Sequence, residues 1–242
     1  CYGFLSVVLV LYLAETGLTE KQIGLLFTLT LAGDAGISLW LTTHADGFGR
    51  KRTLLIGAML MLGAGIIFIL TNNVIVLMAA AIIGVISPSG NEIGRFLSVE
   101  QAGLSQLVSD TSRTKTFAWY NLVGSFATAS GALAGGWIAQ ILQSNGWSAL
   151  EAYRVILMGY AGGGLLLTIL FLSVSSAIEI TKAAAEVTAK KLFGLHKSQK
   201  VVIKLSMLFA LDAFAGGLIV QSMIAYWFHV KFGVDSGVLG SI

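Results

Sequence analysis

Hydrophobic residues run along this chain in long, nearly uncharged stretches that are separated by short polar connections. The stretches predict seven membrane-spanning helices, because one span needs roughly 20 mostly apolar residues. The predicted helices cover residues 3–14, 22–43, 53–71, 74–108, 116–142, 152–174 and 205–230. The first is too short for a full span, and we interpret it as truncated. The pattern therefore predicts an all-α fold, a polytopic bundle of transmembrane helices.

The composition agrees with a protein whose solvent is the lipid bilayer. Apolar residues make up 56% of the chain and charged residues 11%, whereas soluble proteins carry about 25% charged residues. The mean hydropathy is +0.84. The net charge of +3 does not indicate nucleic-acid binding, because the basic residues lie in short connections between spans. The sequence contains no nucleotide-binding loop, nucleophile–base pair or metal-ligand spacing, so we expect no enzyme, no metal and no cofactor.

The distribution of basic residues predicts the orientation in the membrane. Most of the 15 Lys and Arg residues lie in three alternate connections, residues 44–52, 109–115 and 175–204. Cytoplasmic loops carry an excess of Lys and Arg. We therefore expect these connections and the N-terminus on the cytoplasmic side, in a plasma membrane or a bacterial inner membrane.

The connection His44–Arg52 combines one acid, two glycines and three consecutive bases. Gly47 and Gly49 can allow a tight reversal, since glycine adopts backbone angles that other residues avoid. Asp46 precedes Arg50 by four residues and is near enough to pair with it. Such a loop can hold one conformation of a protein if its contacts differ between two states. The alternative is a plain topology signal.

Asp46, Gly49 and the three bases, Arg50, Lys51 and Arg52, resemble the signature between the second and third transmembrane helices of the major facilitator superfamily. The glycine that opens this signature is replaced here by Thr42. The long polar stretch after the sixth span also fits the family. In the family, the acid of the signature is taken to contact a helix of the other half of the protein and to stabilise one conformation.

The resemblance implies twelve spans in two six-helix bundles, of which this chain would hold about seven. Residues 1–174 would form the N-terminal bundle, 175–204 the cytoplasmic linker, and 205–242 the start of the C-terminal bundle. The missing C-terminal half would then be a partner of the part seen here. Residues 178–195 read as a helix that either lies on the membrane surface or joins the two bundles in solvent.

The fifth predicted span carries a set of glycines with a second resemblance. These residues are Gly124, Gly131, Gly135 and Gly136. They resemble the glycine-rich fifth helix of antiporters in the same family, although Ala132 stands where that pattern has proline. The alternative is close packing between helices through small residues.

Ionisable residues within predicted spans are expensive in lipid and are therefore candidates for function. The candidates for a substrate or proton pathway are Asp34, Glu92, Arg95, Glu100 and Asp212. Asp34 shares one helix face with Thr30, Ser38 and Thr42. Glu92 and Arg95 are three residues apart and can pair.

We hypothesise that Asp34, Glu92 and Arg95 line an aqueous cavity and that one of the acids carries a proton. Pro88 should bend the fourth span beside this cavity. The alternative is a buried ion pair together with an acid that caps nearby backbone. The aromatic groups at residues 117–120 and 226–229 are expected to lie at the membrane interfaces. The Gly216-Gly217 pair could interrupt the seventh span.

Together these features predict a secondary active transporter that moves a small solute by alternating access. Proton coupling is expected, with efflux slightly favoured. A uniporter or a nutrient symporter of the same fold is the alternative within transport. A non-transporting membrane sensor is the alternative from another class.

Overall fold

The computed structural model describes residues 2–84, 86, 95–175, 199–217 and 220–241, and every element within these ranges is a helix. The helices are α1 (Tyr2–Ser6), α2 (Val8–Glu15), α3 (Glu20–Phe48), α4 (Arg50–Leu70), α5 (Val74–Ile83), α6 (Arg95–Leu107), α7 (Arg113–Ser144), α8 (Ala149–Ser173), α10 (Gln199–Gly217), α11 (Gln221–Phe232) and α12 (Ser236–Ser241). The all-α fold class predicted from the sequence is confirmed.

Four helices in the described ranges are long and apolar enough to cross a membrane. They lie in α3, α4, α7 and α8. The first predicted span corresponds to the shorter apolar run of α1 and α2. The prediction of one helix over 74–108 is wrong, because α5 ends at Ile83, Gly84 is extended and α6 begins at Arg95. Pro88 and its predicted bend lie outside the described residues. The seventh is not continuous, because α10 ends at Gly217 and α11 begins at Gln221.

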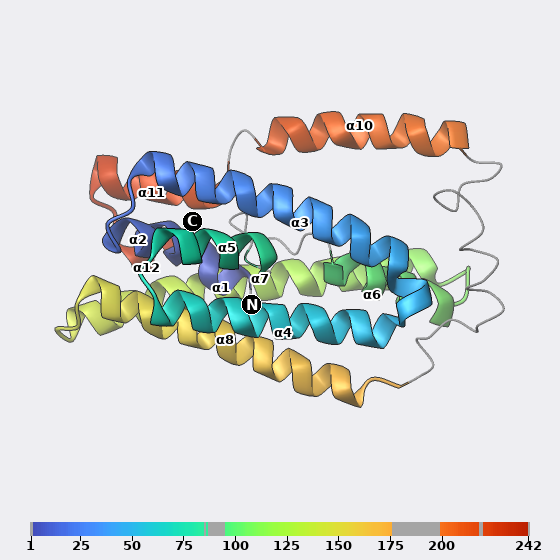
Figure 1. Ribbon diagram of the computed structural model, residues 1–242, viewed down its shortest axis with the longest axis horizontal. Coiled ribbons are helices and arrows are strands. Elements are labelled where there is room, and N and C mark those ends of the chain that lie inside the picture. The colour runs from blue at the N-terminus through green and yellow to red at the C-terminus, as the bar shows by residue number, and fades with distance from the viewer. Residues whose placement is uncertain (1, 85, 87–94, 176–198, 218–219, 242) are drawn as a thin grey trace.

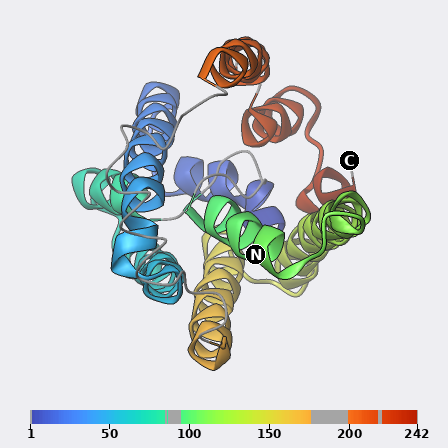
Figure 2. The same cartoon turned by 90° about the vertical axis from the view of Figure 1, so that its right-hand side faces the viewer.

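The core of the bundle is formed around the N-terminal segment. In α2 every side chain from Val8 to Leu13 is buried, and α1 and α2 lie at the centre of the surrounding helices (Figure 2). The Tyr12 hydroxyl donates to the backbone carbonyl of Phe68 in α4. Helix α8 packs along α4, where Gly164 brings its backbone against that of Leu62. Small residues let two helix backbones approach closely.

The connections gather at two ends of the bundle (Figure 1). One end holds the α3–α4 connection, the α6–α7 connection and the C-terminus of α8, and we call it the basic end. The opposite end holds the α4–α5 connection and the α7–α8 connection. At the opposite end Asn73 caps α5, because its side chain accepts hydrogen bonds from the backbone amides of Ile75 and Val76. Ser148 and Glu151 form a capping box that begins α8.

The segments beyond residue 198 contact the bundle only in part. Every described side chain of α10 is exposed. By contrast, α11 packs on α2, where Ser222 Oγ donates to the Ser6 carbonyl at 2.6 Å. Helix α12 packs on α7, and the Ser236 hydroxyl lies 3.4 Å from that of Tyr153. These contacts join the last segments to the bundle at the opposite end.

Candidate functional site

The α3–α4 connection is much shorter than the nine residues predicted. Helix α3 continues to Phe48 and α4 begins at Arg50, so Gly49 alone separates them. Gly49 has φ 105° and ψ 126°, a conformation that side chains with a Cβ atom rarely adopt. The prediction that Gly47 also makes the reversal is wrong, because Gly47 lies inside α3. Asp46 lies in the last turn of α3, and its side chain is outside the described part of the structure.

Arg50 joins the α3–α4 connection to α6. Its side chain is only 5% exposed, and its Nη1 donates to Oε1 of Gln106 at 2.8 Å. A buried guanidinium is costly without such partners. Arg50 therefore holds the start of α4 against the last turn of α6.

Lys51 joins the same connection to α8. Its Nζ donates to the backbone carbonyls of Leu172 at 2.7 Å and Val174 at 2.8 Å. The last carbonyls of a helix have no partner within the helix, and a cation beside them is stabilising. Lys51 therefore caps the C-terminus of α8. Arg52, the third base of the signature, is exposed.

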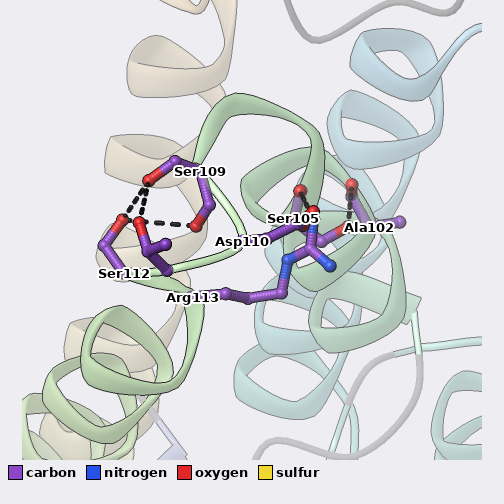
Figure 3. Close-up of polar contacts among 7 residues, drawn as sticks. Ala102, Ser105, Ser109, Asp110, Ser112 and Arg113 are labelled. Atoms are coloured by element: carbon purple, nitrogen blue, oxygen red, sulfur yellow. Dashed lines mark hydrogen bonds and ion pairs between the residues drawn. The ribbon is translucent and has the colours of Figure 1, made fainter.

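Arg113 also donates to a carbonyl near the end of a helix, at the α6–α7 connection (Figure 3). Its Nη2 donates to the Ser105 carbonyl at 3.0 Å and lies 2.7 Å from Oδ1 of Asp110. Both side chains of the ion pair are largely exposed, so the pair itself contributes little. The hydroxyls of Ser109 and Ser112 are 2.7 Å apart and tighten the turn.

The three basic side chains at the basic end make the same type of contact. Arg50, Lys51 and Arg113 each reach another helix end or another helix rather than solvent alone. They tie α4, α6, α7 and α8 together at one end of the bundle. The arrangement can fix the relative positions of these helices, and it would have to be rearranged if they moved apart.

The predicted acidic residues do not gather into one cluster among the described residues. Asp34 is half-buried in α3 and accepts a hydrogen bond from Ser38 Oγ at 3.5 Å. On the same face, Thr30 is buried and donates to the Leu26 carbonyl. Asp212 is exposed on α10.

Glu100 has a specific partner. The Tyr120 hydroxyl of α7 donates to Oε2 of Glu100 in α6 at 2.6 Å. This contact changes the interpretation of Tyr120, which the sequence places in an interfacial aromatic group. Glu92 lies outside the described residues, and Arg95 begins α6 with an undescribed side chain. The hypothesis of a cavity lined by Asp34, Glu92 and Arg95 therefore stays a prediction.

The glycines of α7 differ in what they contact. A Cβ atom at Gly131 or Gly135 would meet the backbone of Phe4 in α1, and one at Gly136 would meet the backbone of α12. A Cβ at Gly124 would meet nothing within 4 Å. Three of the four predicted packing glycines thus stand at close helix contacts.

Several partners could not be recognised in the sequence. Gln106, Tyr120 and the carbonyls of Leu172 and Val174 complete the polar contacts described above. Every residue has a backbone carbonyl, so the sequence does not show which carbonyl accepts a hydrogen bond from a side chain. The spacing of Glu100 and Tyr120, which lie in different helices, predicts no contact either.

Comparison with known proteins identifies the family. A sequence profile of the Major Facilitator Superfamily matches residues 1–242. The chain belongs to this superfamily. It is also 31% identical over 269 residues to a protein of Saccharomyces cerevisiae named "Uncharacterized membrane protein YJR124C". That alignment covers 100% of the chain and 60% of the yeast protein, so the chain spans less than two thirds of this relative.

Membership of the superfamily confirms the resemblance that the Asp46–Arg52 signature carries. The chain is a membrane protein of the major facilitator type, with apolar helices that fit a bilayer. The basic end of the structure is thus the signature end of a member of this superfamily. The contacts of Arg50 and Lys51 show how the signature is held within this chain.

Proposed function

We propose that the complete protein is a secondary active transporter that moves a small solute across a membrane by alternating access, coupled to protons, with efflux favoured. The family match along the whole chain is the observation that supports transport. The same match favours a transporter over an enzyme. We further propose that the basic end faces the cytoplasm, because it carries the signature bases.

The Glu100–Tyr120 pair supports the proton-coupled form of this proposal. A hydroxyl can donate or accept a hydrogen bond. Tyr120 donates to the Glu100 carboxylate at 2.6 Å, and it can accept from the same group once that group is protonated. Glu100 can therefore keep a hydrogen bond to Tyr120 with or without a proton, which suits an acid that carries protons between the helices of a bundle.

The test uses the complete protein in proteoliposomes with an imposed pH gradient. A panel of solutes is supplied, and lumenal pH is followed with a trapped dye. We expect Glu100→Gln to abolish the acceleration by the gradient, because glutamine keeps the acceptor oxygen but does not titrate. Asp34→Asn and Glu92→Gln are tested in the same way. Glu20→Gln is the matched control, since Glu20 is exposed at the start of α3.

Two results would separate the alternatives. Solute exchange without any response to the gradient, in the unmodified protein, identifies a uniporter. Saturable binding of a solute without flux identifies a sensor. If the unmodified protein responds to the gradient and all three acid variants respond equally, the acids are not the coupling groups.

A further inference from the structure

A cavity of about 620 Å³ lies between α3 and the α10–α11 segment, toward the opposite end of the bundle. Its size falls within the range of roughly 300–1,000 Å³ that is typical of small-molecule sites. Helix α3 contributes Phe27 and Leu31 to one wall, and α11 contributes Met223, Trp227 and Phe228 to the other. The two walls come from segments about two hundred residues apart in the sequence.

The chemistry of the walls is apolar and aromatic. Among the described residues that line the cavity, none carries a charge. Its one hydroxyl, that of Thr28, already donates to the Gly24 carbonyl at 2.9 Å. A polar solute entering this space would meet mainly apolar side chains and would recover few of the hydrogen bonds that it makes with water, which is unfavourable. The walls therefore favour a lipophilic solute over a sugar, an ion or an amino acid.

The cavity is also accessible and stiffly built on the α11 side. Trp227 is 48% exposed, and Leu31 is also partly exposed. The Trp227 ring packs edge-on against Phe228 and Phe232, with centroid separations of 5.1 and 5.4 Å. Lys231 Nζ lies 4.7 Å from the centroid of the same ring. These contacts all lie within α11 and restrict the rotation of the Trp227 side chain.

Gly24 creates part of the space. It lines the cavity, and a Cβ atom at this position would meet no protein atom within 4 Å. Gly24 is therefore not required for close packing between helices, unlike Gly33 in the same helix, where a Cβ would meet the backbone of Ile82. A larger side chain at position 24 can occupy the cavity without displacing a neighbouring helix.

We propose that this cavity binds the apolar body of an uncharged lipophilic solute and that such molecules are the substrate class of the protein. The assignment of a substrate class rests on the proposed transport function, whereas the assignment of a binding site does not. Binding itself is tested separately from flux.

The experiment uses the complete protein, reconstituted in liposomes without any gradient, and a photoactivatable diazirine derivative of a twelve-carbon fatty alcohol. Labelled positions are mapped by mass spectrometry. We expect saturable labelling around Met223 that excess unlabelled alcohol displaces. Gly24→Leu should reduce this labelling by about tenfold or more, because surplus methyl groups in an apolar site discriminate by that order.

The matched control is Gly36→Leu. Gly36 lies in the same helix, its Cβ would also meet nothing within 4 Å, and it does not line the cavity. Met223→Trp fills the space from the facing helix and replaces Gly24→Leu if that variant does not fold. Labelling of Met223→Trp is then read at the neighbouring Trp227 and Phe228. Equal labelling in the filled and control variants overturns the proposal. Absence of saturable labelling in the unmodified protein overturns it too.

The two proposals can fail independently. Saturable labelling at Met223 that Gly24→Leu reduces, in a protein that transports no solute of the panel, supports the binding site and refutes the transport function. Gradient-driven flux of a polar solute, without labelling at the cavity, supports transport and refutes the substrate class.

Discussion

Lys51 offers the sharpest test of how the basic end is held together. Its ammonium group donates to two carbonyls at the C-terminus of α8, those of Leu172 at 2.7 Å and Val174 at 2.8 Å. Replacing Lys51 by Met keeps the apolar stem and removes both donors. The carbonyls of Leu172 and Val174 then lose their charged partner, and the C-terminus of α8 loses a favourable cation.

The expected loss of stability depends on how exposed the contact between Lys51 and the α8 carbonyls is. A hydrogen bond to a charged group contributes about 1.5–3 kcal/mol, and a cation at a helix C-terminus about 0.3–1 kcal/mol at an exposed site. Lys51 is half-buried, so water can replace part of the lost interaction. We therefore expect a loss of about 1–2 kcal/mol in the free energy of unfolding, and a correspondingly lower Tm.

The assay is thermal unfolding of the complete protein in detergent, followed by the fluorescence of its tryptophans. Arg52→Met is the matched control, because Arg52 is the adjacent base and is exposed. Added salt should lower the Tm of the unmodified protein slightly and change the Lys51→Met protein less, since screening weakens exposed charge interactions. Equal Tm values for Lys51→Met and Arg52→Met would refute the role assigned to Lys51.

Four further substitutions test other contacts by the same thermal assay. Tyr120→Phe removes the donor to Glu100 and should destabilise by about 1.5–3 kcal/mol; an unchanged Tm would contradict the contact. Gly135→Ala should destabilise by about 1–3 kcal/mol through its clash with α1, whereas Gly124→Ala, with open space around it, should be neutral or stabilising by up to about 1 kcal/mol; equal effects would contradict the packing difference. Asn73→Ala should lose about 0.5–2 kcal/mol of cap stability, and no loss would show that α5 needs no cap.

The sequence predicted the long helices well, because the length of an apolar stretch is set by the membrane it crosses. The third predicted span, 53–71, matches α4 at Arg50–Leu70, and the sixth, 152–174, matches α8 at Ala149–Ser173. The errors came at one helix connection and in the fourth and seventh predicted spans, each of which is two helices in the structure. Charged residues suggested a loop at 44–52, yet Arg and Lys are good helix formers, and only Gly49 leaves the helical conformation.

The candidate site was less predictable than the fold. The signature bases were recognised, but their partners lie 56 and more residues away and include backbone carbonyls. The cavity wall formed by Trp227 and Phe228 looked like an ordinary interfacial group. Its relation to Phe27 depends on how α11 packs beside α3, and no local pattern encodes that relation.

The single-residue reversal at Gly49 has a mechanical consequence. Two helices of 29 and 21 residues that are joined by one residue cannot separate or slide past each other at that end. A displacement of α3 is passed directly to Arg50, and from there through Gln106 to α6. Helices α3, α4 and α6 are therefore expected to move together as a rigid unit. Any large movement of the protein then has to take place where this unit contacts other parts of the chain.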